Sequence, residues 1–322
     1  AGLVARHRTE MLNQARWSRL ERWLRRVSPD VIDQNPDLLI LKTWLLYHQT
    51  RFAELPASLE RLEASLARVA LAPETLDYLQ GEMDAVRSLL AYFAVDTQAT
   101  RLHARGSLEK TRPDFWIVRS LARLTLALAR QMEGDLQGAY AAIYDGYAQE
   151  EVSSPAFKAT LLVTACNVHW MAADLQGLAQ AASQCIEQSQ GAESPEIGNY
   201  GHYHLGGVLY QHNDLPAAER HFSTVWKQPY LSYGDCFLYS ACGLALTHQA
   251  QGRAQKARAA AQSAVDFMLE TGNTTLLPQA QAFQAELALR QGRIATAGQW
   301  AAQLDPLPPL SPVYGIFSPH LT

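Results

Sequence analysis

Residues 199–226, NYGHYHLGGVLYQHNDLPAAERHFSTVW, decide the fold class of this chain because they contain one complete helical hairpin. Apolar residues at helical spacing, among them Leu209, predict a first helix that ends at the turn residue Asn213. Pro216 then fits the first turn of a second helix, which carries Phe222 on its apolar face. Neither helix can bury its apolar stripe alone, so the hairpin predicts neighbours of the same kind.

The same turn recurs at a nearly constant interval. Turn residues are predicted at Gly134, Ala173, Asn213, Gly252 and Gly292, which are separated by 39, 40, 39 and 40 residues. Self-similarity at a fixed period is typical of a stacked repeat array, in which each two-helix unit packs on the units before and after it. The interval therefore predicts a tetratricopeptide-like array.

Small residues occupy two columns of this array. Seven residues before each turn stand Ala127, Cys166, Gly206, Ala245 and Ala285, all small. Five residues after it stand Ala139, Leu178, Ala218, Ala257 and Ala297, small in four of the five cases. Small side chains let paired helices approach closely. Aspartates directly follow three of the turns, at 135, 174 and 214, and we expect them to cap the second helices.

We expect an all-α, right-handed superhelix of about seven to eight two-helix hairpins with a repeat of about 40 residues. Residues 1–112 form irregular N-terminal hairpins, of which the first is incomplete, and residues 113–304 form the regular repeats. Residues 305–322 contain several prolines and cannot continue a helix, so they are a linker or an extended strap that leads to a missing C-terminal domain. The chain starts without methionine and is interpreted as a fragment of a longer protein.

Composition and charge exclude several classes of protein. The hydrophobic fraction of 48% and the charged fraction of 18% are typical of an ordered domain, and the net charge of −4 argues against nucleic acid as the main partner. The chain contains no apolar run long enough for a membrane span and no signal peptide, which favours a cytoplasmic protein. The four cysteines lack CxxC spacing and are expected in the core.

Positive charge is concentrated at the N-terminus. Residues 1–26 contain seven arginines and two glutamates, a net charge of +5, which leaves −9 for the rest of the chain. The predicted helix in RWSRLERWLRRV has arginines on one side and an apolar stripe with Trp17 and Trp23 on the other. A DNA-contacting helix is one interpretation, but we favour a solvated face or a contact with a missing upstream domain.

The sequence resembles the repeat region of the large LuxR-type, ATP-dependent bacterial transcription activators, the MalT-like proteins. The passage from Glu21 to Glu54 carries Trp23, Ser28-Pro29, Val31, Pro36 and Leu38 in the order of that family, with Ser28 where leucine is more usual. The repeat is longer than the roughly 34 residues of the common tetratricopeptide, and the closing passage PVYGIFSPHLT is similar too. The resemblance covers nearly the whole chain.

The resemblance implies a parent protein with an upstream nucleotide-binding domain and a downstream helix-turn-helix domain. ATP would then bind only in the missing upstream domain, because the chain has no GxxxxGK[ST] loop, and DNA only through the missing downstream domain. The repeat region itself is implied to receive a small-molecule inducer and to contact other domains or copies of the parent. We expect no cofactor in this fragment and no membrane partner.

Motifs of catalysis and metal binding are weak. The sequence has no GxSxG elbow and no HExxH, so we expect no enzyme. Cys166 and His169 share a helix face, and His202 and His204 flank Tyr203, but neither pair is joined by a second cluster that completes a tetrahedral set. We therefore predict no metal site.

The inner wall of the superhelix is the better candidate for a binding site. Helical projection from the turns places aromatic and amide side chains on or near this wall, namely Asn167, Trp170, Tyr200, Tyr203, Tyr210, Tyr239 and Gln249. Aromatic rings with polar tips suit a sugar, an aromatic metabolite or a peptide, although each one could instead pack between hairpins. The alternative function is a general scaffold that binds a peptide or protein in its concave groove.

Overall fold

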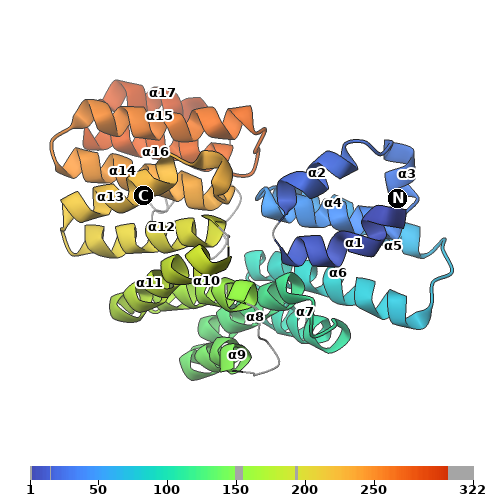
Figure 1. The fold of residues 1–322 in the computed structure, drawn as a ribbon. Helices are drawn as coiled ribbons and strands as arrows, with labels where there is room; N and C mark the ends of the chain where they lie inside the picture. Colours follow the sequence, from blue (N-terminus) through green and yellow to red (C-terminus); the bar gives the residue numbers. More distant parts are fainter. Residues whose placement is uncertain (1, 15, 149–154, 193–194, 304–322) are drawn as a thin grey trace. The chain divides into compact units, whose positions relative to one another are not determined.

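The computed structural model of this chain describes residues 2–14, 16–148, 155–192 and 195–303, and these residues are helical with short turns between the helices (Figure 1). The described residues contain no β-strand, which confirms the all-α class. Among the same residues, no helix combines the length and the apolar character that a membrane span requires. The predicted tail, 305–322, lies outside the described residues.

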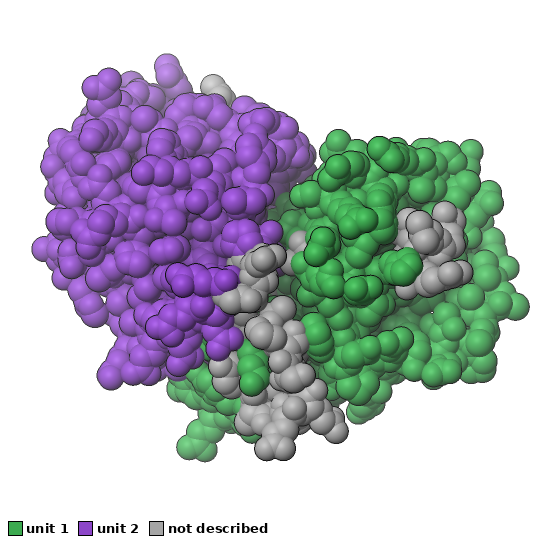
Figure 2. Space-filling model, viewed as in Figure 1, with its two compact units in different colours: residues 1–164 green, residues 165–322 purple. Residues whose placement is uncertain are grey.

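The chain divides into two compact units, residues 1–164 and 165–322 (Figure 2). The helices of the first unit are α1 (Gly2–Asn13), α2 (Trp17–Leu24), α3 (Pro29–Asp33), α4 (Pro36–His48), α5 (Leu55–Leu66), α6 (Pro73–Phe93), α7 (Thr97–Lys110), α8 (Trp116–Met132) and α9 (Leu136–Ala148). Within this unit α4 packs on α5, α6 on α7 and α8 on α9, and α8 also packs on α6. The unit is therefore a series of antiparallel hairpins in which each hairpin contacts the next.

Helix α10 (Pro155–Met171) contains the boundary between the two units. The second unit continues with α11 (Leu175–Ala192), α12 (Pro195–Gln211), α13 (Leu215–Trp226), α14 (Gly234–Ala250), α15 (Ala254–Glu270), α16 (Leu277–Arg290) and α17 (Ile294–Gln303). Each of these helices packs on the next, and the first helices α12, α14 and α16 also pack on one another in order. The hairpin predicted in residues 199–226 is thus formed by α12 and α13.

Every predicted turn residue has a positive φ. The φ angles are +84° at Gly134, +56° at Ala173, +60° at Asn213, +74° at Gly252 and +70° at Gly292. A left-handed residue after the last helical turn is a common way to end a helix, and it reverses the chain into the next one. The constant interval in the sequence therefore marks one repeated left-handed turn.

At the same interval upstream, the turn occurs at a residue that the sequence pattern did not reveal. Val95 has a φ of +60° and lies 39 residues before Gly134, so the hairpin of α6 and α7 belongs to the regular array. Its small-residue columns are Ser88 and Thr100, both fully buried. A β-branched valine is an uncommon left-handed residue, so its sequence gave no turn signal.

The predicted aspartate caps are confirmed. The side chains of Asp135, Asp174 and Asp214 accept hydrogen bonds from backbone N–H groups three residues later, at 2.8, 2.9 and 3.1 Å. Asp96, which follows the turn at Val95, makes the same bond at 2.9 Å. Each cap satisfies one of the N–H groups that the start of a helix leaves without a partner.

The predicted close approach of paired helices is present in the hairpin of α12 and α13. A Cβ atom added at Gly206 would lie 2.7 Å from the ring of Phe222, which is fully buried. The four cysteines are free and buried, as expected for small core residues.

The N-terminal helix α2 has the two faces that the sequence predicted. Trp17, Leu20 and Leu24 are buried, whereas the arginines at 16, 19, 22, 25 and 26 are exposed. In the preceding helix, α1, Arg8 is buried and donates two hydrogen bonds to the carboxylate of Glu82 on α6, at 2.8 and 2.6 Å. The contact of α2 with a missing domain stays a prediction.

Candidate ligand site along the first helices

All seven predicted site residues lie in the second unit and on first helices of its hairpins. Asn167 and Trp170 are on α10, Tyr200, Tyr203 and Tyr210 are on α12, and Tyr239 and Gln249 are on α14. Figure 1 shows α12 and α14 as successive first helices in yellow and orange. Of these three helices, α12 and α14 pack on each other.

Tyr200 connects two successive hairpins. Its hydroxyl donates to Oδ2 of Asp235, in the first turn of α14, at 2.7 Å. Burial raises the pKa of the Asp235 carboxyl, and the hydrogen bond from Tyr200 opposes this effect. The Tyr200 ring is half-buried and lies against Tyr233, with ring centroids 5.5 Å apart. Tyr200 thus offers a polar tip at a junction between hairpins.

Tyr239 and Gln249 continue these connections to the next hairpin. The Tyr239 hydroxyl donates to Oε1 of Gln279 on α16 at 2.9 Å, and burial raises the pKa of Tyr239. Oε1 of Gln249 accepts a hydrogen bond from Nε2 of Gln291 at 2.8 Å. Tyr200, Tyr239 and Gln279 each stand 13 residues before the turn of their own hairpin, so this polar row follows the repeat.

Three of the predicted residues are buried. Tyr203 is 2% exposed, Asn167 is 5% exposed and Tyr239 is 6% exposed. The rings of Tyr203 and Tyr239 stack with centroids 6.2 Å apart, within the hydrophobic core of the second unit. The two tyrosines pack one hairpin on the next, and in this conformation all three side chains present little surface to a ligand.

The other four residues are accessible. Trp170, Tyr200, Tyr210 and Gln249 are half-buried, and the three aromatic rings pack against the edge of the same core. Half-buried aromatic rings beside amide and hydroxyl groups can hold a ligand by apolar contact and orient it by hydrogen bonds. The accessible part of the candidate site therefore consists of these four residues.

His204 is a residue of this region that the site prediction missed. It is fully buried beside Tyr203, with ring centroids 4.6 Å apart, and neither ring nitrogen has a hydrogen-bond partner among the described residues. Burial lowers the pKa of His204 to about 3, so the ring is neutral at physiological pH. Its burial follows from the packing of α12, and helical projection alone gave no reason to select it.

Histidines of the two pairs considered in the sequence, Cys166 with His169 and His202 with His204, contact other side chains in the structure. Nδ1 of His169 lies 2.8 Å from Oδ2 of Asp174, the cap of the following helix. Nδ1 of His202 lies 3.0 Å from Nδ1 of His221 on α13, and burial lowers the pKa of both rings, that of His202 to about 4. Within the described ranges, no group of three or more His, Cys, Asp and Glu side chains lies close enough to hold a metal ion.

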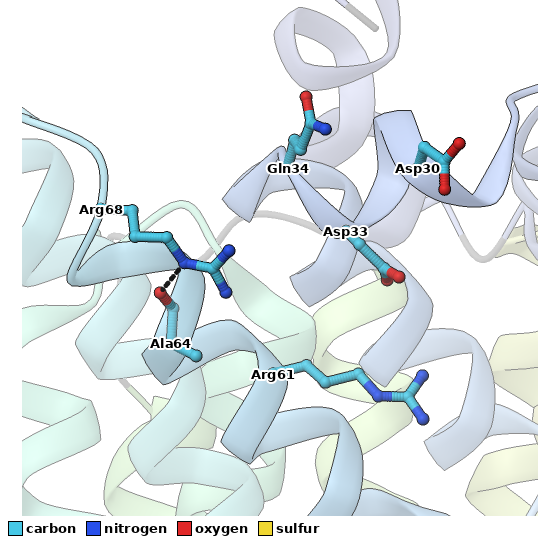
Figure 3. A pocket seen from close by; sticks show the side chains of 6 residues that line it. All are labelled: Asp30, Asp33, Gln34, Arg61, Ala64 and Arg68. Atoms are coloured by element: carbon cyan, nitrogen blue, oxygen red, sulfur yellow. Dashed lines mark hydrogen bonds between the residues drawn. The ribbon is translucent and has the colours of Figure 1, made fainter.

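A separate, polar pocket lies in the first unit between α3 and α5. Its volume is about 390 Å³, and the lining residues are Asp30, Asp33, Gln34, Arg61, Ala64 and Arg68. Figure 3 shows the acidic residues on one wall and the arginines on the other, where Nε of Arg68 donates to the carbonyl oxygen of Ala64 at 2.9 Å. All these side chains are exposed, so the pocket is an open polar depression.

Comparison with known proteins agrees with this architecture. A family model described as the MalT-like TPR region matches residues 81–317, which include α7 to α17, most of α6 and every predicted site residue. The match begins inside α6, which ends at the left-handed turn at Val95. The resemblance seen in the sequence is confirmed, and the chain belongs to the family of MalT-like TPR regions.

Proposed function

We propose that this chain is the effector-sensing and self-association repeat region of a LuxR-type, ATP-dependent transcriptional regulator, and that it acts by binding and not by catalysis. Membership of the MalT-like TPR family supports a repeat region that belongs to a regulator. The observation that carries the sensing role is the row of hydrogen bonds between successive first helices, from Tyr200 to Asp235 and from Tyr239 to Gln279.

The row gives a bound effector a way to change the packing of the hairpins. The bonds from Tyr200 and Tyr239 join side chains 35 and 40 residues apart, so each bond connects neighbouring hairpins. An effector that hydrogen-bonds to the Tyr200 hydroxyl or to Asp235 competes with that connection. Because a ligand shifts a conformational equilibrium by its difference in affinity for the two states, such competition favours a second arrangement of the hairpins.

The effector class follows from the accessible side chains. Trp170, Tyr200 and Tyr210 supply apolar ring faces, while Gln249 and the Tyr200 hydroxyl supply hydrogen-bonding groups. Such a set suits an uncharged or weakly charged polyhydroxylated or aromatic small molecule. Partners of the bound form would be other domains or copies of the parent protein.

Thermal unfolding with a panel of sugars and aromatic metabolites tests the proposal. A ligand that binds only the folded chain stabilises it by about 2.7 kcal/mol at a concentration of 100 Kd, so the midpoint must rise with concentration. We expect Tyr200→Phe to reduce this rise, because the variant keeps the ring and removes the hydroxyl. Tyr78→Phe is the matched control, since Tyr78 donates to Glu74 on α6 at 2.8 Å, in the first unit.

Two further results decide the interpretation. Sedimentation velocity with the stabilising ligand must show a change in self-association if sensing and assembly are coupled. If no member of the panel moves the midpoint, or if Tyr78→Phe reduces the response as much as Tyr200→Phe does, the effector site is not at this row. A peptide or protein partner in the groove is then the better explanation.

A further inference from the structure

Two histidines face each other across the hairpin of α12 and α13. Nδ1 of His202 and Nδ1 of His221 lie 3.0 Å apart, and the ring centroids are separated by 5.1 Å. Both side chains are half-buried, so the pair is partly open to solvent. At this distance one neutral ring donates its Nδ1 hydrogen to the other, so the two Nδ1 atoms face each other. An ion bound by both nitrogens takes the place of this hydrogen: the donating ring carries its proton on Nε2 instead, and both rings turn so that their Nδ1 lone pairs point at the ion.

The hairpin fixes this pair in place. One turn after His202 on α12, Gly206 allows the ring of Phe222 to approach so closely that an added Cβ atom would lie 2.7 Å from it. Phe222 directly follows His221 and is fully buried. The Asp214 side chain caps the start of α13. The two imidazoles therefore extend from a tightly packed helix pair and not from mobile loops.

The distance between the nitrogens matches two neighbouring ligands of one transition-metal ion. For an ion at about 2.0 to 2.1 Å from each imidazole nitrogen, the nitrogen–metal–nitrogen angle would be about 94°. This angle is close to that between neighbouring ligands in square-planar or octahedral geometry, which Cu²⁺ and Ni²⁺ prefer. A tetrahedral Zn²⁺ ion would require the nitrogens to separate to about 3.4 Å.

We propose that His202 and His221 chelate a divalent transition-metal ion of tetragonal preference, Cu²⁺ or Ni²⁺, through their Nδ1 atoms. Water or a small exogenous ligand fills the other coordination positions, because within the described ranges no third His, Cys, Asp or Glu joins the pair. Burial favours the neutral rings, which is the form that binds metal. The positive charge of Arg220, next to His221 in the sequence, opposes a bound cation and limits its affinity.

Binding would replace the hydrogen bond between the two rings by a metal bridge between α12 and α13. The bridge spans 19 residues of chain and closes the hairpin that also carries Tyr200 and Tyr203. It would stabilise the folded hairpin, since a ligand that binds the folded state more tightly than the unfolded state adds to stability. The metal site is independent of the proposed sensing function. The metal would connect α12 to α13, whereas the sensing contact connects α12 to α14.

Calorimetric titration of the full chain with Cu²⁺ and Ni²⁺ tests the proposal, with electron paramagnetic resonance of the Cu²⁺ form. We expect one equivalent to bind with two nitrogen ligands in the spectrum. His202→Gln and His221→Gln should each weaken binding on the order of tenfold or more, and the double variant should lose little beyond that, because either change removes the chelate. His212→Gln is the matched control, as His212 is exposed near the end of α12.

The result that overturns the proposal is equal affinity of the unmodified chain and the double variant, or an equal loss in His212→Gln. A spectrum with fewer than two nitrogen ligands also overturns it. Circular dichroism and the thermal midpoint without metal must show that the glutamine variants are folded. If one of them is not, His221→Asn and His202→Asn repeat the comparison with a smaller amide side chain.

Discussion

Gly201 on α12 gives a sharp test of how closely successive hairpins pack. A Cβ atom at this position would lie 2.5 Å from the backbone oxygen of Ala182 on α11, 2.8 Å from Cγ1 of Ile186 and 3.0 Å from Cβ of Cys185. Backbone and Cβ atoms cannot rotate away, so Gly201→Ala must push α11 and α12 apart. Gly298 on α17 is the matched control, because a Cβ atom there meets nothing within 4 Å.

The two substitutions should have opposite effects. Alanine is favoured over glycine in a helix interior by about 1 kcal/mol, so Gly298→Ala should raise the free energy of unfolding by up to that amount. At Gly201 the same gain is opposed by an overpacking cost of about 3 kcal/mol, at the upper end of the usual range because the contact is with backbone. The expected net loss is therefore about 2 kcal/mol.

Urea unfolding followed by circular dichroism measures both free energies, and hydrogen exchange localises the change. Exchange should become faster in α11 and α12 of Gly201→Ala and stay unchanged in α6 and α7. A gain in stability for Gly201→Ala similar to that for Gly298→Ala would refute the reasoning. It would mean that α11 and α12 are separated by more than the structure shows.

Three further predictions concern single groups. Burial lowers the pKa of His48, which stacks on Trp17, to about 3. The neutral ring therefore contributes stability above the unfolded pKa near 6.5, and this contribution is lost as the pH falls, by about 1.4 kcal/mol between pH 7.5 and 5.5. His48→Phe should remove this pH-dependent loss of stability, as measured by urea unfolding at a series of pH values. Glu82→Gln should cost about 3 kcal/mol, because it leaves the buried Arg8 poorly paired, and adding Arg8→Met should recover most of the loss. Asp214→Ala should cost about 1 kcal/mol through loss of the cap.

Each of these has a result that contradicts it. An unchanged pH slope in His48→Phe would show that the ring is solvated in the folded chain. A double variant of Arg8 and Glu82 that is no more stable than Glu82→Gln would mean that the pair contributes more than its burial costs. For Asp214, Asn serves as the control substitution, since it also caps; equal losses for Asn and Ala would exclude capping as the cause.

The sequence by itself determined the repeat, the turns and the caps, because each of these depends on neighbouring residues. Gly134, Gly252 and Gly292 adopt positive φ at low cost, and the constant interval predicted the same turn at Ala173 and Asn213. The aspartates after the turns reach N–H groups three residues away. Such local interactions are the same wherever the hairpin is placed.

The tertiary structure alone decided which side chains meet across helices. Helical projection put Tyr203 and Tyr200 on the same wall, yet Tyr203 is buried against Tyr239 while the Tyr200 hydroxyl reaches Asp235. His202 was considered with His204, its neighbour in sequence, but it meets His221 on the opposite helix. These contacts depend on the rotation and separation of packed helices, which close approaches such as that at Gly206 fix and which no local pattern encodes.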